Sequence, residues 1–328
     1  MSANPCPVYA YLLDGLGGGR EIGWKEVNEW QASEGILWLV GRPSGGETQR
    51  WLRRSSALPQ EALESMLSTT NNRPRCMTFR QGTLLTLLGM NQSRQTSDEE
   101  LTSISIWIDS HRLIAMRSAP THSFEDIRNS LQPGEGPTRP DDILSHAVQR
   151  IIARLEPLVL KLGRDVDDLE DAILLDQKTH VQQELIALRH RLIILRRQLV
   201  PQHEALSMLQ QRRSWINETN RQVLQETQGR LQHQINDLDS TRERAVLMQD
   251  EITNNQNTKL NETMKIVAVF TAYLMPLNTI TSLLGTNIEG IPFQAGSEHA
   301  YGFTLELLLL VFVMGVSFFI FKKKKWFD

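Results

Sequence analysis

The chain has little cysteine: only Cys6 and Cys76 occur in 328 residues, far apart in sequence. This excludes a disulfide framework or a thiolate metal cluster, and two isolated cysteines fit a reducing cytoplasm as small buried side chains. An excess of positive charge is also absent, because 35 basic residues face 38 acidic ones. That balance argues against a nucleic-acid binder. The N-terminus lacks a basic segment followed by a long apolar one, so we expect no signal peptide.

Signatures of catalysis are missing as well. The glycine cluster Gly15, Gly17, Gly18 and Gly19 lacks the Gly-Lys-Ser/Thr ending of a phosphate-binding loop, which favours a flexible turn. No nucleophile–base pair is evident. The eight histidines are scattered without zinc-ligand spacing: His111, His122, His146, His180, His190, His203, His233 and His299. We therefore expect neither an enzyme nor a bound cofactor.

Long apolar runs are absent until the C-terminal fifth of the chain, which holds two. Residues 266–284 and 303–321 are each about as long as the roughly 20 residues that a membrane-spanning helix needs, and 285–302 joins them. The joining loop has no Lys or Arg, whereas Lys259 and Lys265 precede the first run and Lys322–Lys325 follow the second. Lysines and arginines that flank membrane spans lie mostly on the cytoplasmic side, so we predict a two-pass inner-membrane protein with both termini cytoplasmic. The terminal lysines would anchor to anionic headgroups.

The first part of the chain, residues 1–132, has the pattern of an α+β cytoplasmic domain. Short β-prone runs occur at 8–13, 36–40, 76–79, 83–88, 103–108 and 113–117, and helical spacing occurs at 47–54 and 60–67. The last two β-prone runs flank Asp109–Arg112, which indicates a hairpin.

Prolines and glycines between residues 132 and 140 mark a domain boundary, after which the apolar period is helical. Breaks near 176–179 and 211–214 predict two antiparallel helices and then one very long one, with Pro157 and Pro201 kinking or interrupting the first two. The third helix would run from about residue 215 into the membrane, roughly 100 Å in length. Its apolar residues are sparse and suit a stripe that packs against neighbours, including copies of the same chain.

A polar face runs along the first apolar segment. Spacings of three and four place these residues on one side of a helix: Asn261, Met264, Ala268, Thr271, Met275, Asn278, Ser282 and Gly285. An amide such as Asn278 finds no partner in lipid, so this face must meet protein or water. Helix–helix packing and pore lining both fit the spacing. Two helices cannot enclose a pore, so transport would require a ring of subunits assembled through the long helix.

Acidic residues offer further candidate sites. Glu289 and Glu298, with His299 beside the latter, are the formal charges of the joining loop, and in a ring they would attract cations at the mouth. Solvated loop acids explain them equally well. A second cluster lies in the helical region and is more typical of a solvated helix face: Asp165, Asp167, Asp168, Glu170 and Asp171.

The segment Gly285-Thr286-Asn287-Ile288-Glu289-Gly290-Ile291-Pro292 resembles the Gly-Met-Asn loop of the CorA family of two-helix divalent-cation transporters. The resemblance extends to the Tyr-Leu-Met-Pro-Leu run at 273–277, to the closing Phe-Lys-Lys-Lys-Lys-Trp at 321–326 and to the layout of the whole chain. It implies a funnel-shaped homopentamer in the lipid bilayer. The first crossing would line the pore, and Gly285, Thr286, Asn287 and Glu289 would form the entrance, where the Asn287 amide contacts a hydrated ion.

Two departures point to one branch. Thr286 replaces the Met of the motif, and Phe293-Gln294 stands where magnesium-transporting members place an acidic residue. Both features are similar to the ZntB zinc-transport branch. The resemblance therefore implies Zn²⁺ as cargo, with Ni²⁺ or Cd²⁺ as further substrates, and uptake stimulated by the proton gradient. The scattered histidines fit transport, since a tight zinc site would not release its ion.

The predicted division of the chain is an α+β domain (1–132), a helical region with a long stalk helix (141–263), a pore-lining transmembrane helix (264–284), an external loop (285–302), a second transmembrane helix (303–321) and a basic cytoplasmic tail (322–328). The first hypothesis is pentameric Zn²⁺ uptake. One alternative is an Mg²⁺/Co²⁺ channel of the same family. The other is a membrane-anchored coiled-coil scaffold, which would carry no ions.

Overall fold

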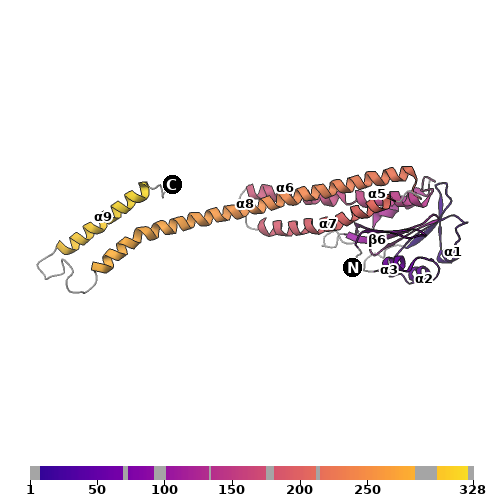
Figure 1. Ribbon diagram of the computed structural model, residues 1–328, viewed down its shortest axis with the longest axis horizontal. Helices are drawn as coiled ribbons and strands as arrows, with labels where there is room; N and C mark the ends of the chain where they lie inside the picture. The colour runs from indigo at the N-terminus through magenta and orange to yellow at the C-terminus, as the bar shows by residue number, and fades with distance from the viewer. Residues whose placement is uncertain are drawn as a thin grey trace. The chain divides into compact units, whose positions relative to one another are not determined.

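The structure is a computed structural model that describes residues 8–68, 73–91, 101–132, 134–174, 181–211, 215–284 and 301–323. The chain divides into two compact units, Met1–Gln249 and Asp250–Asp328, and each is described by itself. Figure 1 shows the order of the elements along the chain.

The first unit is built on a seven-stranded sheet. The strands are β1 (Tyr9–Leu13), β2 (Gly19–Ile22), β3 (Ile36–Gly41), β4 (Arg75–Thr78), β5 (Thr83–Met90), β6 (Leu101–Ile108) and β7 (Arg112–Arg117), in the order β2-β1-β3-β7-β6-β5-β4. Neighbouring strands are antiparallel except for the central β3–β7 pair, which is parallel. The six β-prone runs are confirmed to within a few residues, and so is the hairpin across Asp109–Arg112.

Gly15, Gly17 and Gly18 lie in the turn between β1 and β2, and Gly19 begins β2. This confirms a turn and leaves no helix for a phosphate loop. The Asp14 carboxylate accepts hydrogen bonds from the backbone N–H groups of Leu16 and Gly18. Gly17 has φ of 100°, which favours glycine. The β2 strand itself was missed, because the exposed Arg20 and Glu21 of this edge strand lack an apolar pattern.

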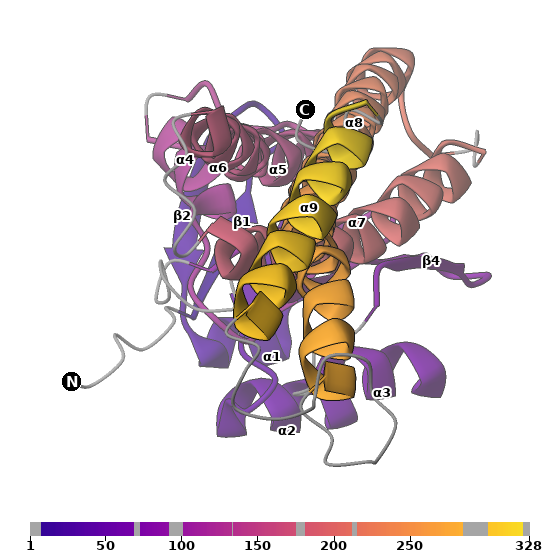
Figure 2. The same cartoon turned by 90° about the vertical axis from the view of Figure 1, so that its left-hand side faces the viewer.

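Helices cover both faces of the sheet (Figures 1 and 2). On one face, α2 (Gly46–Arg54) and α3 (Gln60–Leu67) bury Trp51, Leu52 and Met66 against strand residues. Short helix α1 (Trp24–Glu29) adds Val27, whose carbonyl accepts a bond from the Trp51 indole at 3.2 Å. On the other face lie α5 (Pro140–Ala153) and α7 (Val181–Gln210), with the short η1 (His122–Phe124) and α4 (Glu125–Ser130) beside α5.

The helical region has one more helix than expected. α5 ends at Ala153 and α6 (Glu156–Leu174) begins anew with Pro157 in its first turn, so the predicted interruption there is confirmed. Pro201 lies inside α7 and does not interrupt it. Burial of Leu199 and Gln202 explains this, since the Gln202 side chain accepts the Leu88 backbone N–H at 2.7 Å. The predicted break at 176–179 lies outside the described residues. So does the predicted break at 211–214, except for residue 211, which is a turn directly after α7.

The long helix is confirmed as α8 (Glu218–Leu284), 67 residues without interruption. Its first half differs from expectation, because the sparse apolar residues are buried against their own chain: Leu224, Leu231, Ile235 and Leu238. One apolar residue per turn suffices here, since α5, α6 and α7 supply the rest of the core. Gln234 donates to the Ile152 carbonyl of α5 at 3.2 Å.

A buried polar joint fixes the start of α8 to the start of α5. The Asn220 side chain donates to Asp141 at 3.0 Å and to Asp142 at 2.7 Å, and accepts from the Ser145 hydroxyl at 2.8 Å. The Asn217 side chain caps α8 by accepting the Asn220 backbone N–H at 2.7 Å. Asn220, Asp141 and Ser145 are at most 5% exposed.

The second unit contains the rest of α8, from residue 250, and α9 (Tyr301–Lys323). Among the described residues, α8 carries the one stretch that is long and apolar enough to cross a membrane, judged by length and composition. The described apolar part of α9 is shorter, Leu307–Phe319.

Candidate functional site

The polar face predicted on the first apolar segment lies on one continuous helix, α8. Its members are exposed in the single chain, with Met264 at 62% and Met275 at 67% exposure. The same is true of the rest of the face: Asn261, Ala268, Thr271, Asn278 and Ser282. These residues are therefore accessible on the second unit of the single chain, and their role as a pore lining stays a prediction.

The opposite side of the same helix is mainly apolar. Val269, Tyr273, Pro276, Leu277 and Ile280 are partly covered there, whereas Ile266 and Phe270 are exposed. The two sides therefore differ in polarity, and the amides of Asn261 and Asn278 lie on the polar side. An uncovered amide in an apolar stretch requires a partner or water, because an unpaired polar group in hydrocarbon is costly.

Threonine hydroxyls along α8 bond to the backbone of their own helix. The Thr271 hydroxyl donates to the Val267 carbonyl at 2.8 Å, and the Thr279 hydroxyl donates to the Met275 carbonyl at 2.9 Å. Each hydroxyl has one hydrogen, so what remains for an outside partner is the lone pairs of the oxygen. These threonines are therefore acceptors toward their surroundings.

Sequence reasoning missed part of this face. The same spacing continues upstream of Asn261 through Asn257 and Asn254 to Asp250, all of them exposed. Thr279 also belongs to the face, since it lies four residues beyond Met275 and three before Ser282. Extending the three- and four-residue steps beyond the apolar run would have found all of them. The polar face is thus longer than its membrane-length portion.

The remaining predicted site residues lie outside the described part of the chain: Gly285, Thr286, Asn287, Glu289, Glu298 and His299. The entrance that they would form stays a prediction. Their anchor points, Leu284 at the end of α8 and Tyr301 at the start of α9, are described as helix termini.

The whole chain resembles known transport proteins. The family described as CorA-like Mg²⁺ transporter protein matches residues 33–323. The chain belongs to the CorA family. A divalent cation transporter, CmaX of Pseudomonas aeruginosa, is 29% identical over 97% of this chain and 96% of its own length. A zinc transport protein, ZntB of Yersinia enterocolitica, is 30% identical over 97% of this chain and 95% of its own.

Solved structures agree on the fold. The full-length CmaX structure matches this CorA-family chain with a TM-score of 0.79 and 28% identity, covering 99% of this chain and 100% of that one. The complete structure of the CorA magnesium transporter from Methanocaldococcus jannaschii matches with a TM-score of 0.76, covering 97% and 98% of the two chains. At 17% identity the latter supports the fold alone. The predicted resemblance to the family is confirmed.

The acidic cluster of α6 is paired with arginines in this family member. Asp165 lies 3.7 Å from Arg191 of α7, and Arg244 of α8 lies 2.8 Å from Asp167 and also bonds Glu170. The hydrogen bonds to Glu170 and then Asp167 raise the pKa of Arg244 above its ordinary value. Within the described ranges, no group of three or more His, Cys, Asp or Glu side chains is arranged to hold a metal ion. The cluster therefore has the character of an ion-paired helix face.

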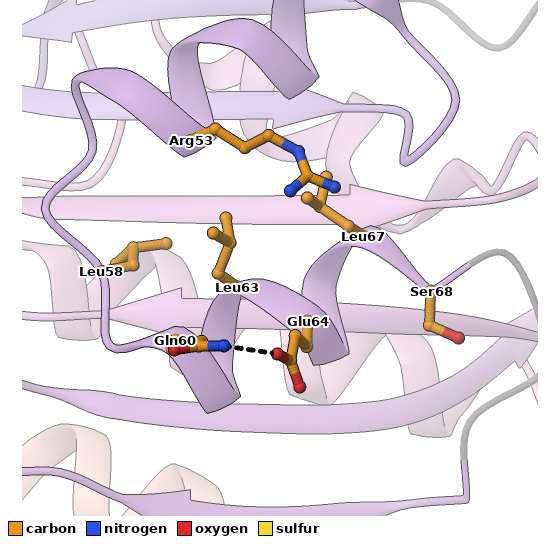
Figure 3. A pocket seen from close by; sticks show the side chains of 7 residues that line it. All are labelled: Arg53, Leu58, Gln60, Leu63, Glu64, Leu67 and Ser68. Carbon is orange, nitrogen blue, oxygen red and sulfur yellow. Dashed lines mark hydrogen bonds between the residues drawn. The ribbon is translucent and has the colours of Figure 1, made fainter.

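A separate groove of about 570 Å³ lies over α3 (Figure 3). Its lining mixes apolar and polar side chains: Arg53, Leu58, Gln60, Leu63, Glu64, Leu67 and Ser68. Gln60 donates to Glu64, one turn further along α3, at 3.0 Å. No residue that the sequence singled out lies in this groove.

Proposed function

We propose that the chain transports divalent metal cations across the inner membrane as a homopentamer, with Zn²⁺ uptake as its principal activity. The observation that supports this is the polar face of α8, exposed in the single chain within a stretch apolar enough to cross a bilayer. Five such faces around an axis would enclose water, and two crossings from one chain would not. The cations would be cargo, not cofactors.

In this proposal the first crossing, residues 264–284, lines the pore, and 303–321 forms the second crossing. The domain 1–132 and the helical region 141–263 lie in the cytoplasm with the basic tail 322–328, and the loop 285–302 faces outward. The lysine distribution supports this orientation, because basic residues flank both crossings on one side only. The entrance would be formed by Gly285, Thr286, Asn287 and Glu289, with Glu298 and His299 attracting cations.

The lining residues would be Asn261, Met264, Thr271, Met275, Asn278 and Ser282. A divalent ion sheds its water reluctantly, so neutral oxygen groups that hold the hydration shell suit its passage better than tight ligands. This chemistry is compatible with the absence of a three-residue metal cluster among the described residues.

Zinc is favoured as cargo by the zinc transport proteins among the relatives and by Thr286 in the loop motif. Mg²⁺ or Co²⁺ is the second candidate, favoured by the family description as Mg²⁺ transporters. Uptake of Zn²⁺, Mg²⁺, Co²⁺ and Ni²⁺ in competition, in one preparation of proteoliposomes, separates the two. Zn²⁺ influx displaced only by large excesses of the other ions supports zinc.

The decisive experiment uses liposomes that contain the full chain and a zinc-sensitive dye. We expect Zn²⁺ influx that is faster when the outside is more acidic, and an Asn287→Ala variant that is severely impaired. An ionophore that collapses the pH gradient should slow influx, and an unchanged rate would remove proton coupling from the proposal. A membrane-anchored scaffold predicts no flux and full tolerance of Leu at Asn278 and Asn287.

A further inference from the structure

We propose that Thr279 and the backbone carbonyl of Ala272 form an additional contact point for the hydrated cation in the middle of the first crossing. This inference rests on the proposed function and adds two groups to the polar face of α8. The supporting features are the proline inside the helix, the direction of the threonine hydrogen bonds and the position of both groups beside Met275.

Pro276 frees one carbonyl in the middle of α8. In a regular helix the N–H of each residue bonds the carbonyl four residues before it, and proline has no N–H. Pro276 lies inside α8, which continues to Leu284. The Ala272 carbonyl is therefore without its helical donor, in a segment where lipid offers none. Such an oxygen must accept a hydrogen bond from water, from another helix or from the hydration shell of an ion.

The Ala272 position adjoins the polar face. Residues Ala268, Ala272, Met275, Thr279 and Ser282 follow one another at spacings of four and three, so they form one column along the helix. This column shares Ala268, Met275 and Ser282 with the predicted face. Ala272 is thus placed at the edge of that face, seven residues or about two turns of helix before Thr279, with Met275 between them.

The hydroxyl hydrogen of Thr279 is already donated in a hydrogen bond, so its oxygen can only accept. Its hydroxyl donates to the Met275 carbonyl at 2.9 Å, as the Thr271 hydroxyl does to Val267 at 2.8 Å. Both threonines are exposed in the chain. Two hydroxyl oxygens and one carbonyl oxygen therefore offer only lone pairs to whatever lies beside Met275.

Acceptor groups are the ones that a hydrated cation needs. The water molecules around Zn²⁺ or Mg²⁺ point their hydrogens outward, so a wall that contacts them must accept hydrogen bonds. The shell of an anion presents the opposite polarity. The mid-crossing contact is therefore specific for hydrated cations and acts without direct metal ligation, which allows release.

The test compares isosteric substitutions on two sides of one helix turn. Thr279→Val removes the hydroxyl and keeps the shape, Thr279→Ser keeps the hydroxyl, and Thr281→Val makes the same change two residues on, on the opposite side of the helix. Each full-length protein is reconstituted in liposomes with a Zn²⁺ or Mg²⁺ indicator, after size-exclusion chromatography has verified an unchanged assembly. Initial influx rates are measured across cation concentrations to separate KM from the maximal rate.

We expect Thr279→Val to lower cation influx about fivefold, the usual effect of losing one hydrogen bond between neutral groups, with Thr279→Ser and Thr281→Val close to the parent. Pro276→Ala returns an N–H to the Ala272 carbonyl and should lower influx in the same direction. If the parent carries cations and Thr279→Val is unaffected, or falls no further than Thr281→Val, the mid-crossing contact is refuted and the transport function stands. A parent protein that transports no divalent cation would refute both the mid-crossing contact and the proposed transport function.

Discussion

Replacing Asn220 with leucine should loosen the start of the long helix. Asn220 is 5% exposed and joins α8 to α5 through three side-chain hydrogen bonds, to Asp141, Asp142 and Ser145. Leucine has the same branched shape and the same number of side-chain heavy atoms, so the substitution removes the bonds without opening a cavity. The effect on stability therefore measures the polar joint itself.

The size of the loss in stability depends on which hydrogen bonds the three partners of Asn220 retain. Asp141 retains the Asn217 backbone N–H at 2.9 Å and Arg139 at 2.8 Å, and Ser145 retains the Asp142 carbonyl at 3.0 Å. The Asp142 Oδ1 atom, in contrast, loses its 2.7 Å bond from Asn220. The loss of three hydrogen bonds, one of which leaves a partly buried carboxylate oxygen without its partner, should lower the free energy of unfolding by about 3 kcal/mol. For a unit of this size that corresponds to a fall in Tm of about 6 to 12 °C.

The assay is thermal unfolding of the full-length protein in detergent, followed by tryptophan fluorescence. The buried Trp38, Trp51 and Trp107 report the first unit. The control is Asn236→Leu, at an exposed position of the same helix, which should shift Tm by no more than about 2 °C. Hydrogen exchange should also quicken at the first turns of α8. A Tm for Asn220→Leu equal to that of the control would refute the idea that the joint fixes this helix.

Three further predictions concern the first unit. Burial alone would raise the pKa of Asp142, but hydrogen bonds from Asn220, Thr138 and the backbone outweigh burial and lower that pKa below its ordinary value. The ionised carboxylate therefore stabilises the fold above about pH 4. The free energy of unfolding, measured with urea, should fall as the pH drops below that value, and the fall should be smaller in Asn220→Leu. Gly17→Ala should lower the free energy of unfolding by about 2 kcal/mol, because φ is 100° and the new Cβ would lie 2.4 Å from the Gly134 carbonyl oxygen. Gly46→Ala, at the first residue of α2 and in open space, should have little effect. Arg244→Met should lower the free energy of unfolding by less than about 1 kcal/mol, because the ion pairs of Arg244 with Asp167 and Glu170 are solvent-exposed. The difference from the parent should shrink further in high salt. A loss above about 2 kcal/mol would contradict this expectation.

The strands and helices with periodic apolar residues were predictable from the sequence. β5 and β6, with continuous burial along both strands, and α2 and α3 were found at nearly their observed bounds. The edge strand β2 was not, since pairing with β1 holds its exposed Arg20 and Glu21 in place. Local pattern predicts an element that buries its own apolar face, and it misses one that a neighbour holds in position.

Burial along α8 depended on contacts that the sequence does not reveal. Leu231 and Leu238 looked too sparse for a core, yet α5, α6 and α7 complete it around them. The polar face of the second unit was the easier case, because regular spacing alone defines one side of a helix. The arginine partners of the α6 carboxylates were invisible in sequence, since Arg191 and Arg244 lie far along the chain.

The central claim is that the polar face of α8 surrounds a water-filled path through an assembly of copies. Single cysteines introduced at Thr271, Asn278 and Ile280, in a background without Cys6 and Cys76, can be tested with a membrane-impermeant thiol reagent. We expect modification at positions 271 and 278 with loss of cation influx, and protection of position 280, which lies on the opposite side of the helix. Modification of position 280 with 271 and 278 protected would contradict this claim.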